Sequence, residues 1–249
     1  MFRLYLILVI SLFVSSCKKE IEKPITPKGN ICLIIDDFGY SYNETIQSYL
    51  SLEPNFTCSV IPGHNFSSQI GLVADSLGFE VMIHMPMESF DYDQSHEKKY
   101  LLTDKMNINV LKELLTSAFD EIPQAIGMNN HQGSKATESL QLMKDLARNL
   151  KEMDKYFIDS YTNPESRAFI TMRQFGVKTE VRQIFLDHIE DYESVKNKLY
   201  ELAQLSHNMH VAIGIGHATK PITLEVLQNE IPKLKQLGYQ FLNSSEVVR

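Results

Sequence analysis

The stretch Ile31–Tyr40, ICLIIDDFGY, raises the question on which the fold and the function depend. Its first five residues are apolar or carry a thiol, as in a buried strand, and they lead directly into two carboxylates, Asp36 and Asp37. Two neighbouring negative charges repel, and partial burial raises the cost of ionising both. Either water screens them in a loop, where Asp commonly starts a turn or caps a helix, or a cation compensates them.

Strand-like and helix-like segments alternate from Asn30 to the end of the sequence. Seven apolar segments, the sixth of them VRQIFLDH over residues 181–188, are each followed by an amphipathic one, and a final strand-like segment closes the chain. Gly78, Gly176 and Gly238 stand where a helix should stop before a strand. This alternation predicts an α/β fold with a parallel sheet covered by helices. Because no dinucleotide-binding glycine pattern follows the first strand, we expect a closed or nearly closed barrel rather than an open sheet.

The N-terminal residues have the pattern of an export signal, MFRLYLILVISLFVSSC. Their apolar run, residues 4–13, is short for a membrane span. Residues 14–17 resemble a bacterial lipobox, which predicts cleavage before Cys17 and lipidation of that Cys; the alternative is an ordinary secretory signal with an incidental Cys. Residues 18–28 read as a polar tether, and residues 29–249 as one domain. We therefore expect an exported lipoprotein, anchored to a membrane through Cys17, in the periplasm or on the cell surface.

The composition excludes some partners. The formal net charge is −7, and no patch rich in Lys and Arg is interleaved with aromatic residues, so nucleic acid is not an expected partner. We expect a monomer. Cys32 and Cys58 lie in strand-like apolar runs and are predicted to be buried thiols, although a disulfide between them stays open in an oxidising compartment.

Acidic and histidine residues follow the predicted strands at their carboxyl ends. In an α/β barrel these ends share one rim, which is where active sites form. The residues at the seven ends are Asp36 and Asp37, His64, His84 with Glu88, Asn129 with Asn130 and His131, Asp159, Asp187 with His188, and His217.

This set of residues points to a hydrolytic metal site. Imidazole and carboxylate groups are the ligands of a catalytic zinc or similar divalent ion, with one position left for water. A second carboxylate can then accept a proton from that water, and a histidine can protonate the leaving group. The doublet of Asp36 and Asp37 would serve both purposes, one residue binding the cation and the other acting as base.

Each residue also has a simpler interpretation. His64, after Pro-Gly, is equally a turn residue or a substrate contact. His84 follows an apolar run, as a core histidine would. For Asp187 and His188 we favour a helix cap over a site role. His217 lies in GIGHATKP, where the glycines allow a ligand to approach closely.

The strand-end motifs together resemble the divergent polysaccharide deacetylase family, a branch of the metal-dependent polysaccharide deacetylase superfamily. The resemblance runs in order from Lys28 to Val248, and it rests on IIDDFG, SVIPGH, IHMPME, GMNNHQGS, FIDSYT, IFLDH and IGIGH. It implies an irregular (β/α) barrel of seven to eight mostly parallel strands. The family usually shows Met where Gln132 stands and Pro where Ala218 follows His217; the second departure bears on how His217 is held.

The resemblance also implies roles for individual residues. Asp37 would bind the metal and Asp36 would be the base, while His217 would match the late histidine that assists the leaving group. His84 and His131 would complete the ligand set, for which zinc is the favoured ion. The better-studied branch takes both histidines from one short motif after a single strand, and this sequence has no such pair there. Contacts to the substrate or to the ligands are expected from His64, Glu88, Asn129, Asn130 and Asp159.

Three functions are compatible with these expectations. The first is hydrolysis of N-acetyl or O-acetyl groups on an envelope or extracellular glycan, with the metal stabilising the oxyanion. The second is a lipid-anchored protein that binds glycan or assists envelope assembly without turnover. A metal hydrolase acting on another ester or amide is a third alternative.

Overall fold

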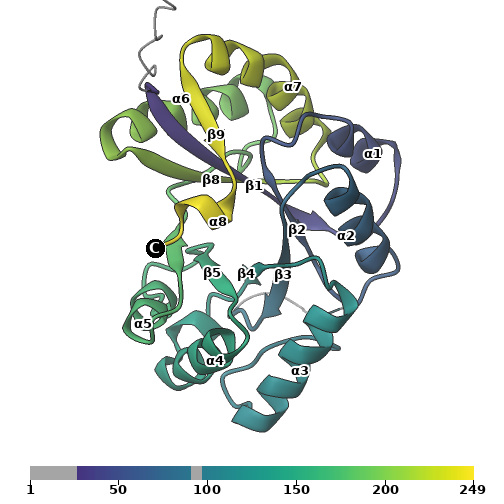
Figure 1. The fold of residues 1–249 in the computed structure, drawn as a ribbon, viewed down its shortest axis with the longest axis vertical. Helices are drawn as coiled ribbons and strands as arrows, with labels where there is room; N and C mark the ends of the chain where they lie inside the picture. The colour runs from purple at the N-terminus through teal and green to yellow at the C-terminus, as the bar shows by residue number, and fades with distance from the viewer. Residues whose placement is uncertain (1–26, 91–96) are drawn as a thin grey trace, which may run out of the picture.

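Nine parallel strands form one curved sheet in the computed structural model, which describes residues 27–90 and 97–249 (Figure 1). The predicted signal, Cys17 and nearly all of the predicted tether lie outside the described residues. The strands are β1 (Gly29–Phe38), β2 (Thr57–Val60), β3 (Val81–Met87), β4 (Gly127–Gln132), β5 (Tyr156–Asp159), β6 (Thr179–Val181), β7 (Ile184–Phe185), β8 (Val211–His217) and β9 (Tyr239–Leu242).

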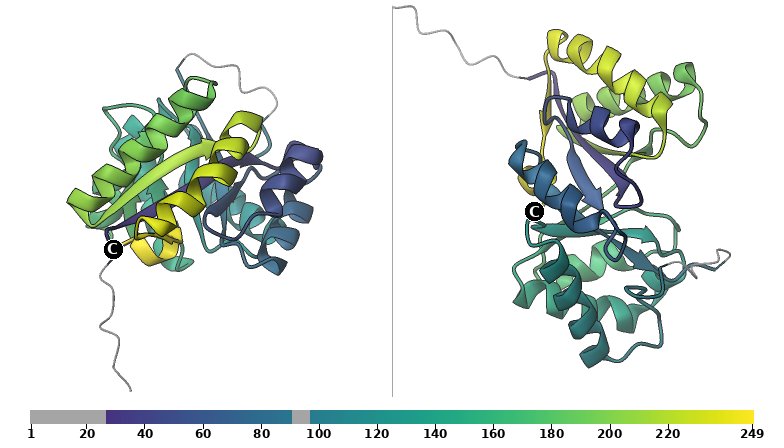
Figure 2. Two further views of the ribbon diagram at one scale, coloured as in Figure 1. Left: turned by 90° about the horizontal axis from the view of Figure 1, so that it is seen from above. Right: turned by 90° about the vertical axis from the view of Figure 1, so that its right-hand side faces the viewer.

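Helices follow most of the strands, and most of them cover the outside of the curved sheet (Figures 1 and 2). They are α1 (Glu44–Leu50), α2 (Ser67–Ser76), α3 (Ile108–Glu121), the short 3-10 turn η1 (Ala136–Glu138), α4 (Leu140–Glu152), α5 (Ala168–Gln174), α6 (Tyr192–Met209), α7 (Pro221–Gln236) and α8 (Ser244–Val247). Gly78, Gly176 and Gly238 adopt positive φ just beyond α2, α5 and α7, as their positions in the sequence predicted.

Strand β1 lies between β2 and β8 in the sheet, whose order is β6-β5-β4-β3-β2-β1-β8-β7. Strand β8 pairs with β1 over Asn30–Asp36. The C-terminal half of β1 pairs with β2, whereas its N-terminal half pairs with β9. The apolar run Ile31–Ile35 is therefore hydrogen-bonded to three strands.

Both faces of the sheet are buried, which accounts for the nearly continuous apolar runs of its strands. The outer face packs under the helices in the main core, to which Leu33 and Ile35 belong. The inner face carries a smaller core that includes Cys32, Ile34 and Val247. Helix α8 contributes Val247, so the C-terminal residues fill part of the concave side.

The prediction of an irregular, nearly closed barrel is confirmed, with one difference. Residues 181–188, expected to form a single strand, are divided between β6 and β7. Strand β6 pairs with β5 and β7 with β8, so this segment crosses the opening of the half-barrel instead of closing it. At the crossing, Arg182 N donates to Asp159 O and Gln183 N donates to Ile213 O.

Cys32 and Cys58 are buried free thiols, which settles the alternative of a disulfide between them. Within residues 27–90 and 97–249, no helix has the length and apolar character that crossing a membrane requires.

Candidate metal centre

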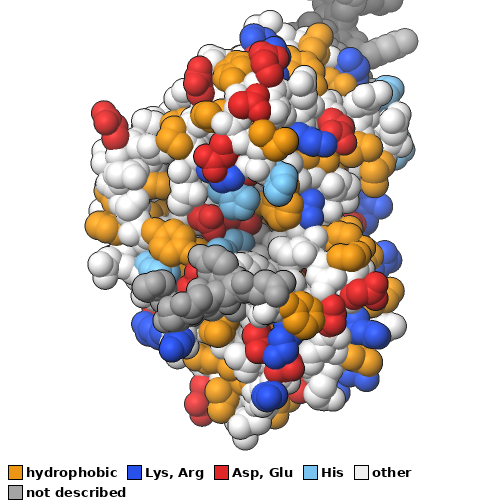
Figure 3. Space-filling view, turned by 180° about the vertical axis from the view of Figure 1, so that it is seen from behind, with side chains coloured by type: hydrophobic (Ala, Val, Ile, Leu, Met, Phe, Trp, Pro, Cys, Tyr) orange, Lys and Arg blue, Asp and Glu red, His pale blue; other side chains and the backbone are white. Residues whose placement is uncertain are grey.

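The alternation of side chains along the strands brings four predicted residues to the inner face. Residues two apart in a strand point to the same side. Cys32 and Ile34 belong to the inner core and precede Asp36 at this spacing, and Met82 likewise precedes His84. Strand β8 aims His217 inward by the same rule, after Ile213 and Ile215. In strand β4, His131 pairs with Pro86 of β3, which lies two residues after His84. His131 therefore points to the inner face as well. In Figure 3, histidine and acidic side chains gather in a hollow near the centre of the face shown.

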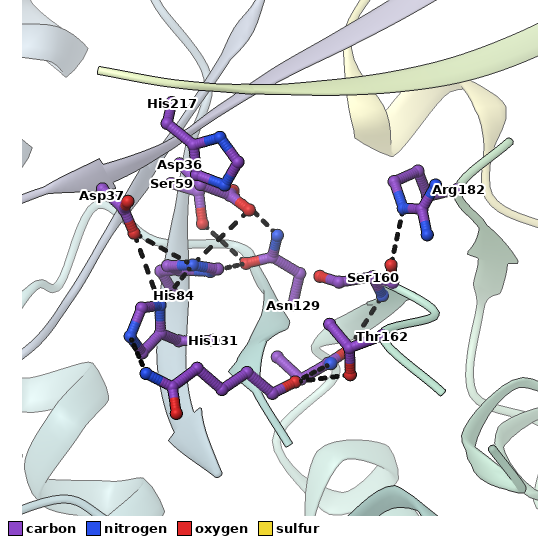
Figure 4. A network of polar contacts seen from close by, with 12 residues as sticks. Asp36, Asp37, Ser59, His84, Asn129, His131, Ser160, Thr162, Arg182 and His217 are labelled. Carbon is purple, nitrogen blue, oxygen red and sulfur yellow. Dashed lines mark hydrogen bonds and ion pairs between the residues drawn. The ribbon is translucent and has the colours of Figure 1, made fainter. Parts of the chain in front are cut away.

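A bulge explains how both members of the Asp36–Asp37 doublet reach the same site. In a regular strand they would point to opposite faces. The register shifts here, because Ile35 pairs with Cys58 and Phe38 pairs with Val60. One extra residue of β1 is therefore accommodated, and Asp37 takes a left-handed backbone with φ of 64°. Asp37 thus turns towards His84 and His131 (Figure 4). Phe38 returns to the outer core.

Asp37, His84 and His131 each direct one ligand atom at a common point. Asp37 Oδ1 lies 3.5 Å from His84 Nε2 and 3.4 Å from His131 Nδ1, and the two nitrogens are 3.0 Å apart. Zinc bonds of about 2.0–2.1 Å at tetrahedral angles place ligand atoms about 3.3 Å apart. Asp37 Oδ1 is buried and makes no hydrogen bond in the described part of the chain. This carboxylate and imidazole set therefore fits a divalent cation.

Asn129 fixes the ring of His84. Its Nδ2 donates to Asp36 Oδ1 at 2.9 Å, so its Oδ1 faces the other way and accepts from Ser59 Oγ and from His84 Nδ1, both at 2.7 Å. His84 must therefore carry its proton on Nδ1, which leaves the lone pair of Nε2 for the candidate metal position. The predicted neighbour Asn129 thus joins the proposed base to a proposed ligand (Figure 4).

Glu97 lies beside His131 as Asn129 lies beside His84, and it was not identified from the sequence. Its Oε1 lies 3.1 Å from His131 Nε2 and accepts a hydrogen bond from Tyr40 at 2.9 Å. A carboxylate oxygen only accepts, so Nε2 carries the proton and the lone pair of Nδ1 faces His84 Nε2. Burial alone would lower the pKa of His131, but the nearby carboxylates of Asp37 and Glu97 raise it to about 9.

His217 is held by Asp187, and here the expectation of a helix cap was wrong. Asp187 is fully buried and accepts from the backbone N–H and from Nδ1 of His217, each at 2.7 Å. Helix α6 begins later, and Asp191 caps it by accepting from Ser194 N. Ala218, which stands where the family usually has Pro, donates its N–H to Asp36 O at 2.8 Å and ties the end of β8 to β1.

The two carboxylates of the doublet differ in electrostatics. Burial raises the pKa of Asp36 and outweighs the imidazoles of His84 and His217, which favour its charged form. Burial acts in the same direction on Asp37, but its close contacts with His131 and His84 hold its pKa well below the usual range. Asp36 is thus the more basic of the two carboxylates, as a proton acceptor requires.

Four further predicted residues contact other groups. Asn130 Oδ1 accepts from Ser160 N, and its Nδ2 donates to Gln132 O. Asp159 accepts from Tyr161 N and Ser166 Oγ. Asn130 follows the inward-pointing Asn129, and Asp159 follows the inward-pointing Ile158, so both side chains point outward. Their hydrogen bonds stabilise the loops that follow the strands. Glu88 pairs with Lys135 at 2.6 Å and accepts from Asp104 N. The ring of His64 packs on Tyr40, with centroids 4.4 Å apart.

The glycines before His217 serve packing rather than the approach of a ligand. A Cβ on Gly214 would lie 2.4 Å from Leu202, and one on Gly216 would lie 3.0 Å from Thr223 and 3.4 Å from Asp187 Oδ2. The expectation that a ligand fills this space was therefore wrong. The space belongs to α6, α7 and the carboxylate that holds His217.

These features define an α/β half-barrel protein with a candidate metal centre at the carboxyl ends of its strands. The chain belongs to the divergent polysaccharide deacetylase family, whose model matches residues 33–248. It is 30% identical over 207 residues to the uncharacterized protein YibQ of Escherichia coli (strain K12), a match that covers 83% of this chain. The chain spans 63% of the length of that relative.

Solved structures share the fold at low sequence identity. An uncharacterized protein, ATU2773 from Agrobacterium tumefaciens C58, has a TM-score of 0.83 at 17% identity, with 90% of each chain covered. The catalytic domain of a peptidoglycan N-acetylglucosamine deacetylase from Eubacterium rectale has a TM-score of 0.51 at 15% identity, with 86% of this chain and 88% of that one covered. At these identities the likeness supports the fold alone.

Proposed function

We propose that this protein is a metal-dependent hydrolase that removes N-acetyl or O-acetyl groups from an envelope or extracellular glycan. The observation that carries the proposal is the convergence of Asp37 Oδ1, His84 Nε2 and His131 Nδ1 on one point, where the buried oxygen of Asp37 has no hydrogen bond from any residue that the structure describes. Membership of the divergent polysaccharide deacetylase family supports the choice of acetyl groups.

Asp37, His84 and His131 would hold the cation, and zinc suits this set of oxygen and nitrogen ligands. When bound, such an ion acts as a Lewis acid towards a carbonyl oxygen and makes water a better nucleophile at neutral pH. The hydrogen bonds that the two imidazoles donate to Asn129 and Glu97 keep their rings oriented for binding.

Asp36 and His217 would move the protons. Asp36 is buried beside the ligands, and its raised pKa suits it to accept a proton from the attacking water. His217 donates Nδ1–H to Asp187, so its Nε2 is the nitrogen that can hand a proton to the departing amine or alcohol. The pairing of Asp36 with His217 across β1 and β8 keeps the proposed base and the proposed acid next to each other.

Export and lipid anchoring belong to the same proposal and rest on the sequence of residues 1–17. A chain anchored through Cys17 in the periplasm or on the cell surface would have glycan within reach. A polymer of N-acetylglucosamine is the first substrate to test, because one structural neighbour is described as a peptidoglycan N-acetylglucosamine deacetylase.

The test is the metal content of residues 28–249, purified without chelator, compared with His131→Ala. About one zinc ion per chain in the wild type, a clear loss in the variant and release of acetate from the polymer are expected. Negligible metal in both proteins, even after reconstitution with zinc, would overturn the proposal.

A further inference from the structure

A buried carboxylate, Glu97, lies behind the candidate metal centre on the connection between β3 and α3. It is 7% exposed, and its Oε1 lies 3.1 Å from His131 Nε2. Its Oε2 is also buried and has no hydrogen-bond partner among the residues that the structure describes. Burying a carboxylate with one oxygen unpaired costs stability. Its position therefore calls for an explanation in the chemistry of the site.

Tyr40 holds Glu97 in place. The hydroxyl of Tyr40 donates to the same Oε1 at 2.9 Å, and its ring packs on His64 with centroids 4.4 Å apart. Tyr40 follows the doublet of Asp36 and Asp37 by three residues, just after β1 ends. The segment that supplies the proposed base and one proposed ligand thus also positions the carboxylate that contacts another ligand.

The two candidate histidine ligands have different hydrogen-bond acceptors. His84 donates to the neutral amide oxygen of Asn129, whereas His131 donates to the charged carboxylate of Glu97. An anionic acceptor makes a stronger hydrogen bond to N–H and increases the basicity of the other ring nitrogen. His131 Nδ1 is therefore the better electron donor of the two imidazole ligand atoms.

We infer that Glu97, held by Tyr40, is a positioning residue that tunes the metal affinity of the centre through His131. The inference rests on the proposed function, since it requires that Asp37, His84 and His131 bind a cation. Glu97 contacts neither a ligand atom nor the proposed base in the described contacts. It acts by fixing which nitrogen of His131 carries the proton and by adding one negative charge behind the ring.

Glu121→Gln provides a matched control. Glu121 anchors the same connection, because its carboxylate accepts from Lys99 at 3.2 Å and from Tyr100 at 2.7 Å, two and three residues beyond Glu97. It also accepts from Gly63 N at 2.6 Å. Its replacement loosens the loop without removing a group that contacts His131, so it separates loop anchoring from a direct effect on the ligand.

The experiment measures zinc affinity by competition with a chromophoric chelator for the wild type, Glu97→Ala, Glu97→Gln, Tyr40→Phe and Glu121→Gln. Glu97→Ala should weaken binding by about 10- to 100-fold, the usual effect of removing such a partner. Glu97→Gln should weaken zinc binding less, because the amide oxygen of Gln still accepts from Nε2–H of His131. Tyr40→Phe should also weaken zinc binding less, because the carboxylate of Glu97 keeps its charge. Glu121→Gln should bind zinc like the wild type.

Cobalt substitution adds a readout that a loosened loop does not alter. The visible spectrum of bound Co²⁺ should change in Glu97→Ala and Glu97→Gln and stay unchanged in Glu121→Gln. If Glu97→Ala fails to fold, Glu97→Gln and Tyr40→Phe carry the test. Equal affinities in the wild type and the Glu97 variants, or an equal loss in Glu121→Gln, would overturn the inference while leaving the proposed function intact. A wild type that binds no zinc would overturn both.

Discussion

Asp187 accepts two hydrogen bonds from His217, one from its backbone N–H and one from its imidazole Nδ1, each at 2.7 Å. Thr223 Oγ1 donates to the same carboxylate at 2.8 Å. The backbone bond fixes the position of His217, and the imidazole bond fixes its tautomer. A single buried side chain thus sets both the place and the protonation pattern of the proposed acid.

Asp187→Asn should lower deacetylase activity by about 100-fold or more, because the amide cannot accept from both N–H groups of His217 and the tautomer is no longer specified. Zinc content should stay that of the wild type. Thr223→Val, which removes only the third hydrogen bond, should cost much less activity. Full activity in Asp187→Asn would show that the tautomer of His217 does not matter for turnover.

The same pair predicts how folding stability depends on pH. Burial would lower the pKa of His217, but Asp187 raises it from 6.5 to about 9, so protonation of His217 favours the folded state. This contribution, on the order of 3 kcal/mol, is fully present below pH 6.5 and is lost as the pH rises through about 9. The pKa of Asp187 is lowered, since the hydrogen bonds from His217 outweigh burial; its contribution is present above about pH 4 and lost as the pH falls.

Urea unfolding of the chelator-treated protein checks this dependence. The difference in unfolding free energy between the wild type and His217→Gln should be largest near pH 6 and should shrink towards pH 9.5. A difference of the same size at both values would mean that the ion pair does not form in the folded protein.

The sequence was sufficient to predict a metal site at the strand ends, because parallel strands bring their carboxyl ends together. The choice of Asp37, His84 and His131 as its ligands was implied by the family resemblance. The sequence could also have separated Asn129 from Asn130 and Asp159, since alternation from the apolar inner residues puts only Asn129 inward. Asp37 breaks this alternation, and nothing in the sequence marks the bulge that turns it inward.

Glu97 and Asp187 could not be identified in the same way. Glu97 lies in a polar connection without periodicity, next to two lysines, and looks like a solvated charge. Asp187 precedes two further acidic residues in DHIED, so several positions could have capped the helix, and Asp191 does so. Both act through contacts with residues 30 or more positions away, which depend on tertiary packing rather than on local pattern.

Asn129→Ala should weaken both the fold and the proposed metal centre. It removes the partner of Asp36 Oδ1, His84 Nδ1 and Ser59 Oγ at once, and buried groups left without partners cost about 1–3 kcal/mol. Zinc affinity should fall by about 10- to 100-fold, because the ring of His84 is no longer oriented. Chemical unfolding and zinc titration measure the two effects. Ser59→Ala, which removes one of the donors to the Asn129 amide oxygen and leaves His84 oriented, should show much smaller changes in both, and equal effects would contradict the assigned role of Asn129.

Asp36→Asn and Asp37→Asn separate turnover from binding, since they make the same change of charge at adjacent residues with different proposed tasks. Asp36→Asn should keep zinc and lose about 100-fold or more in activity, because the proton acceptor is gone while Asp37, His84 and His131 remain. Asp37→Asn should lose zinc together with activity.

Equal loss of zinc in the two variants would show that Asp36 is a ligand and not the base. Glycan affinity, measured by titration of the polymer, decides the remaining alternative. If the wild type releases no acetate and Asp36→Asn binds glycan as tightly as the wild type, the doublet serves a centre that holds glycan without hydrolysing it. If acetate release depends on Asp36 while glycan affinity does not, the carboxylate that β1 places on the inner face is the base of a deacetylase.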